Sequence, residues 1–142
     1  MLDTFNNEIL AYQATRISGS NKPYYYCLEH LKLLAGKNKE QTPQVIFHTD
    51  QGYVYSSRAF CQAHQHYNIP RSMSRVGRPT DNPIIEALNG WMKEELYLDF
   101  GFVAAEDVPS LLDEYVHYFN NIRSAFALGY KSPVQYKTEL GF

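Results

Sequence analysis

The sequence has no apolar stretch near the roughly 20 residues needed to span a bilayer, and Met1 is followed by Leu2, Asp3 and Thr4 instead of a basic and then apolar leader. It has only two cysteines, which form no C-x-x-C pair. These features exclude a membrane-spanning protein and a disulfide-stapled fold from the predictions, and we expect a cytoplasmic protein with no membrane partner. The 142 residues, 44% hydrophobic and 20% charged, predict one ordinary folded domain.

Excess positive charge is also missing, since the formal net charge is −2. A domain that holds nucleic acid by bulk electrostatics usually has a strongly basic face. The exception is the segment 69–80, which carries Arg71, Arg75 and Arg78 and no acidic residue. This arginine loop could contact phosphates locally, although three solvated loop arginines are an equally good interpretation of the charge pattern.

Strand and helix patterns alternate along the chain, which predicts an α/β fold. Strands are expected at 8–17, 43–47 and 71–74. Helices are expected at 24–34, from Ser56 or Ser57 to 67, at 83–97, at 109–121 and in a short turn after Ser132. His64 and His66, two residues apart on one helix, point to different faces, so a zinc site is not expected there.

Two carboxylates lie where chemistry is often found. Asp50 follows the apolar run PQVIF within HTDQG, at the carboxyl end of a predicted strand. Glu86 shares a narrow polar stripe with Asn89 and Lys93 on the helix 83–97, beside the apolar stripe, and Asn82 joins this stripe if the first helical turn includes it. Either residue alone is more simply a turn or surface carboxylate. Together they offer oxygen ligands from separate elements, as a hard divalent cation requires.

The flanking text resembles a known family. Residues 48–57, HTDQGYVYSS, are followed by SMSRVGRPTDNPIIEALNGWMKEEL at 72–96, with 35 residues between Asp50 and Glu86. The closing segment at 118–136 reads YFNNIRSAFALGYKSPVQY. This composite motif is similar to the catalytic core of insertion-sequence transposases related to retroviral integrases.

The resemblance implies a ribonuclease-H-like fold and an Asp-Asp-Glu site for two Mg²⁺ or Mn²⁺ ions, in which Asp50 and Glu86 match the second and third acids. The family acts on transposon-end and target DNA, cutting and transferring strands without a covalent enzyme intermediate. The family pattern implies DNA contacts for Lys93, Asn82 and Arg123, and supporting roles around the site for His48 and Asp81. Ala125 departs from the pattern, because many relatives have a histidine there.

The first acid of the family has no counterpart, since no Trp-x-Thr-Asp-x-Thr segment occurs. We therefore expect residues 1–142 to be one integrase-like core that lacks its first strand or strands and ends in the family's helical segment. Metal binding would then be weak, and a homodimer or an intact transposase would be partners besides DNA. The alternatives are a non-catalytic DNA-binding or assembly fragment and, less in keeping with the motif, a hydrolase that uses Asp50 and Glu86 as an acid/base pair.

Overall fold

The structure is a computed structural model that describes residues 1–17, 20–36, 45–77 and 81–142. The chain divides into two compact units. Unit 1 comprises residues 1–14 and 84–142, and unit 2 comprises residues 15–83. No helix in the described part of the chain is long and apolar enough to cross a membrane.

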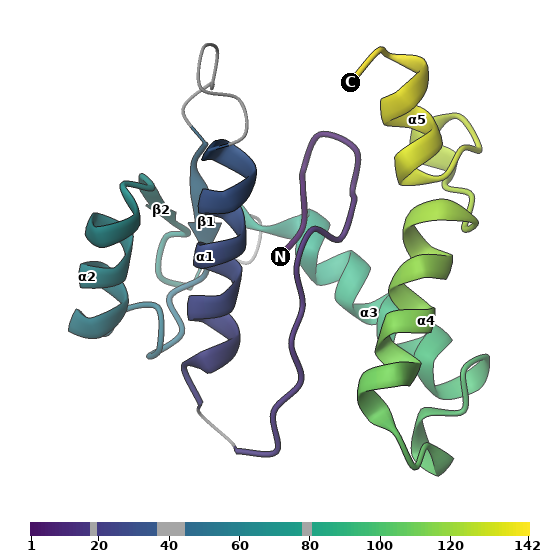
Figure 1. Cartoon of the computed structure of the whole chain (residues 1–142), viewed down its shortest axis with the longest axis horizontal. Coiled ribbons are helices and arrows are strands. Elements are labelled where there is room, and N and C mark those ends of the chain that lie inside the picture. The colour runs from purple at the N-terminus through teal and green to yellow at the C-terminus, as the bar shows by residue number, and fades with distance from the viewer. Residues whose placement is uncertain (18–19, 37–44, 78–80) are drawn as a thin grey trace. The chain divides into compact units, whose positions relative to one another are not determined.

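Unit 2 contains the described sheet. Helix α1 (Lys22–Gly36) packs against α2 (Arg58–Tyr67), while β1 (Phe47–Thr49) pairs in parallel with β2 (Arg71–Met73). Figure 1 shows these elements from purple-blue to teal. The parallel strands are joined through α2, the crossover that parallel pairing requires. The predicted helix 24–34, the helix capped at Ser57 and the strand at 71–74 are confirmed.

Among the described residues, the strand predicted at 43–47 overlaps β1, which spans Phe47–Thr49, only at Phe47. Residues 43 and 44 lie outside the described part, and β1 begins only at Phe47, whose N–H donates to the carbonyl of Pro70 at 3.0 Å. The pairing partner fixes this start, because β2 begins at Arg71 directly after Pro70. The apolar run predicts a strand here, but pairing with β2 sets the residues at which the strand begins and ends.

Unit 1 is helical, with α3 (Pro83–Leu98, whose first residue lies in unit 2), α4 (Val108–Asn121) and α5 (Pro133–Glu139). Short 3₁₀ turns, η2 (Phe102–Ala104) and η3 (Phe126–Leu128), connect them. All three predicted helices are confirmed. The core is built from Ile9, Leu88, Tyr115 and Phe119.

The strand predicted at 8–17 is wrong: in residues 8–17, the structure has only an isolated antiparallel bridge between Leu2 and Ile9. The side chain of Asn120 makes the hydrogen bonds to Ile9 that a neighbouring strand would otherwise make. The Ile9 N–H donates to Oδ1 of Asn120, and Nδ2 of Asn120 donates to the Ile9 carbonyl, both at 2.9 Å. Because one amide side chain satisfies both backbone groups of Ile9, no sheet partner is needed there.

Candidate functional site

Asp50 lies in an exposed turn directly after β1, as the sequence predicted. Its Oδ1 accepts the N–H of Gly52 at 2.8 Å, and its Oδ2 accepts no hydrogen bond from the described residues. A Cβ on Gly52 would lie 3.1 Å from Asp50 Oδ1 and 3.3 Å from Tyr55 Cδ2. Gly52 therefore serves this turn by allowing close approach, and it leaves one carboxylate oxygen available.

His48, two residues before Asp50, is held by Ser72 of β2 and by Ser74, which directly follows that strand. The register pairs His48 with Ser72, so its Nδ1 lies 2.9 Å from Ser72 Oγ and its Nε2 3.1 Å from Ser74 Oγ. Sequence reasoning named His48 but missed Ser72 and Ser74. Their spacing of two residues on a predicted strand, which places both side chains on one face, is the signal that could have identified them.

Glu86 lies in the first turn of α3 and is exposed. Asn89 and Lys93 are exposed along the same helix, while Leu88 is buried and Met92 packs against the core, so the predicted polar stripe beside an apolar stripe is confirmed. The Glu86 carboxylate accepts no hydrogen bond and forms no ion pair within the described ranges. Glu86 belongs to unit 1 and Asp50 to unit 2.

Asp81 and Arg75, which precede α3 in the sequence, form an ion pair with each other. Arg75 Nη2 lies 2.7 Å from Asp81 Oδ1, and both Arg75 Nε and the Arg75 backbone N–H donate to Asp81 Oδ2 at 2.9 Å. The hydrogen bonds from the Arg75 side chain, then from its backbone, hold the pKa of Asp81 far below its usual range. Asn82, which follows Asp81, is half-buried. Arg78 lies outside the described residues.

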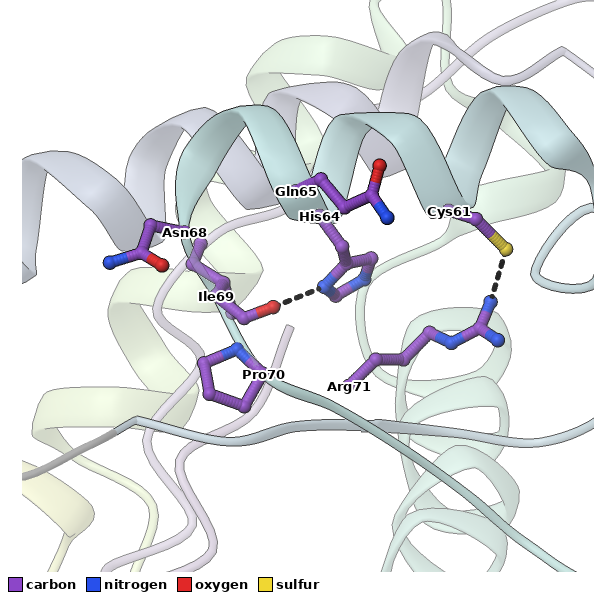
Figure 2. A pocket seen from close by; sticks show the side chains of 7 residues that line it. All are labelled: Cys61, His64, Gln65, Asn68, Ile69, Pro70 and Arg71. Carbon is purple, nitrogen blue, oxygen red and sulfur yellow. Dashed lines mark hydrogen bonds between the residues drawn. The ribbon is translucent and has the colours of Figure 1, made fainter.

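Arg71 is exposed but engaged within the protein. Its Nη1 donates to the Tyr55 carbonyl at 2.9 Å and to Cys61 Sγ at 2.8 Å. Figure 2 shows the Arg71 side chain reaching Cys61 at one side of a hollow of about 340 Å³. A phosphate that bound Arg71 would compete with these two contacts.

His64 lines the same hollow and is 4% exposed, whereas His66 is exposed, which confirms that the two histidines occupy different faces of α2. The Nδ1 of His64 pairs with the Ile69 carbonyl at 2.9 Å (Figure 2), and its Nε2 has no partner in the described part of the chain. Burial lowers the pKa of His64, so the neutral ring is favoured. No group of three or more His, Cys, Asp or Glu side chains with metal-site geometry occurs among the described residues.

Arg123 has a structural partner that the sequence did not reveal. Its Nε lies 2.6 Å from Glu95 Oε1, and the two side chains are 17% and 19% exposed. Glu95 Oε2 also accepts the hydroxyl of buried Tyr115 at 2.9 Å. Arg123 therefore joins α3 to the end of α4, and its predicted DNA contact stays a prediction.

Comparison with known proteins gives these residues a context. Residues 86–140 match the integrase core domain family. The chain is 28% identical over 139 residues to the putative transposase InsK of insertion sequence element IS150 from Escherichia coli K12, covering 98% of this chain and 47% of that protein. It is 31% identical over 137 residues to an uncharacterised transposase-like protein of Haemophilus influenzae, covering 96% and 61%. The chain thus spans about half the length of these curated relatives.

Solved structures agree on the fold. The chain superposes with a TM-score of 0.73 and 22% identity on a chain of the simian T-cell lymphotropic virus intasome in complex with a PP2A regulatory subunit, covering 94% of this chain and 45% of that one. A second match is the catalytic core domain of BIV integrase, with a TM-score of 0.52, 16% identity and coverage of 80% and 72%. The predicted ribonuclease-H-like α/β fold is thereby confirmed. In sequence the chain is therefore similar to insertion-sequence transposases over almost its whole length, and in fold it is similar to the catalytic core domain of BIV integrase.

Proposed function

We propose that this chain provides part of a transposase core that cuts and transfers DNA strands, with Asp50 and Glu86 as carboxylate ligands of Mg²⁺ or Mn²⁺. The observation that carries the proposal is that both carboxylates of the family-like motif are exposed at element ends and keep oxygens that accept no hydrogen bond from the described residues. Free carboxylate oxygens are the ligands that hard divalent cations take. In structural carboxylates of the same chain both oxygens are instead occupied, by Arg75 in Asp81 and by Arg123 and Tyr115 in Glu95.

A divalent cation bound there would activate water and neutralise charge that develops on a phosphodiester. The protein's part is to fix the ligands. The turn at Gly52 orients the Asp50 carboxylate, and the hydrogen bonds that His48 makes with Ser72 and Ser74 fix its ring. The α3 helix holds Glu86 two turns before Lys93, which is exposed and suited to a phosphate contact.

Mn²⁺ titration of the whole chain by calorimetry tests the proposal. We expect saturable binding that Asp50→Asn and Glu86→Gln each weaken by at least about tenfold, because each substitution removes an anionic ligand. Glu114→Gln is the matched control, since it removes the same charge from an exposed position on α4. Identical affinities for Glu86→Gln and Glu114→Gln would show that the cation binds by general charge alone.

A measurement of duplex DNA binding, with and without Mn²⁺, distinguishes the metal-dependent role from a non-catalytic DNA-binding role. We expect affinity to fall as salt rises, and to fall further in Lys93→Ala, because phosphate contacts release counterions. Lys22→Ala, at the exposed start of α1, is the control. Salt-sensitive DNA binding that is unaffected by Mn²⁺ would favour the non-catalytic DNA-binding role over the metal-dependent one.

A further inference from the structure

A second pocket, in unit 1, plays no part in the proposed metal site. Its volume is about 280 Å³, below the roughly 300–1,000 Å³ of most ligand pockets. Buried Leu88, Phe119 and Leu128 line it, together with Trp91 and Arg123. An apolar hollow of this size admits one small ring system.

Two aromatic side chains of the pocket are open to solvent. Trp91 is 54% exposed and Phe126 is 81% exposed, and both line the pocket. Phe126 is carried on a tight loop in which the N–H groups of Ala125 and Tyr130 donate to Lys131 and Ala125 carbonyls at 3.1 and 2.9 Å. These bonds fix the backbone of the loop, and the Phe126 ring that it carries stays outside the core.

The same loop is strained at Tyr130. This residue has φ 62°, in the left-handed region that side chains with a Cβ seldom adopt. Its ring contacts Phe126 edge-on, with 5.5 Å between the ring centroids, and is 71% exposed. Strain that keeps large aromatic rings at the surface is costly to folding, which points to a use for those rings.

The Arg123 side chain indicates which kind of ligand suits this pocket. Its guanidinium lies 5.7 Å from the Trp91 ring centroid and 5.3 Å from that of Phe119, and its Nε is used by Glu95. Neither of its Nη groups donates a hydrogen bond to any described residue. A purely apolar occupant would leave these donors buried and unpaired, whereas a flat ring with carbonyl oxygens would supply both a stacking face and acceptors.

We propose that this pocket receives one unpaired nucleobase of DNA, stacked against Trp91 and Phe126 with a carbonyl oxygen toward Arg123. The inference rests on the proposed function for DNA as the ligand. Unit 1 carries eleven Asp and Glu residues against four Lys and Arg, so phosphate attraction contributes little to binding here. Stacking supplies the affinity, which makes binding at this pocket only weakly dependent on salt.

Trp91 reports directly on the pocket, because it is the only tryptophan in the chain. The experiment titrates the whole chain in EDTA with a five-residue oligothymidylate, and with an abasic oligonucleotide of the same length and charge. We expect saturable quenching of Trp91 fluorescence by oligothymidylate and at least about tenfold weaker binding of the abasic strand. Phe126→Ala should weaken the quenching at least about fivefold. Phe142→Ala is the control, because it removes a ring that is 78% exposed in the same unit and contacts Phe5 outside the pocket.

Three results would overturn the inference. Equal quenching by the abasic strand would mean that phosphates are bound, and an unchanged Phe126→Ala titration would place the base elsewhere. Stronger quenching by a neutral Ala-Phe-Ala peptide would assign the pocket to a protein partner. Because the titration is done in EDTA, an absence of Trp91 quenching would not contradict the proposed metal-dependent function. Conversely, we expect Glu86→Gln to lose Mn²⁺ binding without changing the Trp91 signal.

Discussion

Asn120 should be among the side chains on which the stability of this protein most depends. Its amide donates to and accepts from the backbone of Ile9, 111 residues away, through two hydrogen bonds of 2.9 Å, and both residues are buried. Replacing Asn120 with alanine removes both bonds and leaves the N–H and C=O of Ile9 without partners. An unsatisfied buried group costs about 1–3 kcal/mol, so with two such groups the free energy of unfolding should fall by about 2–6 kcal/mol.

Urea unfolding of Asn120→Ala, followed by circular dichroism, measures this loss, and hydrogen exchange of the Ile9 amide locates it. Asn121→Ala is a matched control from the next position, because the Asn121 side chain is exposed and, among the described residues, bonds only to His117 of its own helix. A surface change of this kind usually stays within about 0.5 kcal/mol. If Asn120→Ala destabilised the chain no more than Asn121→Ala, the view that this amide replaces a strand neighbour would be refuted.

Two further predictions concern α2. Burial lowers the pKa of His64, so below pH 6.5 the unfolded chain binds more protons than the folded chain. The free energy of unfolding should therefore be highest above pH 6.5 and fall as the pH drops toward the folded-state pKa. Urea midpoints measured across this pH range should show the slope, and His64→Phe should reduce it. Ser57→Ala should lower the free energy of unfolding by about 1 kcal/mol, because Ser57 Oγ accepts the N–H of Phe60 as the helix N-cap; equal thermal shifts for Ser57→Ala and the neighbouring Ser56→Ala would contradict this.

The helices were predictable because their signals are local. Ser57 marks the start of α2, and Ser132 with Gln135 forms a capping box at the start of α5, so a few adjacent residues contain the whole signal. The short strands were harder, since β1 is bounded by its pairing with β2 and not by its own apolar run. The predicted first strand failed for the same reason: Ile9 finds its hydrogen-bond partner in Asn120, which its own segment does not reveal.

The sequence by itself determined the α/β class, the helix boundaries and the two carboxylates, Asp50 and Glu86, that carry the family-like motif. Only the tertiary structure decided which charged groups are free and which are used. Arg75 forms an ion pair with Asp81, and Arg123 forms one with Glu95. Asp50 and Glu86 instead keep carboxylate oxygens that accept no hydrogen bond from the described residues. Ion pairing depends on distances between side chains that can lie far apart in the sequence, 28 residues for Arg123 and Glu95, and charge patterns along a chain do not contain those distances.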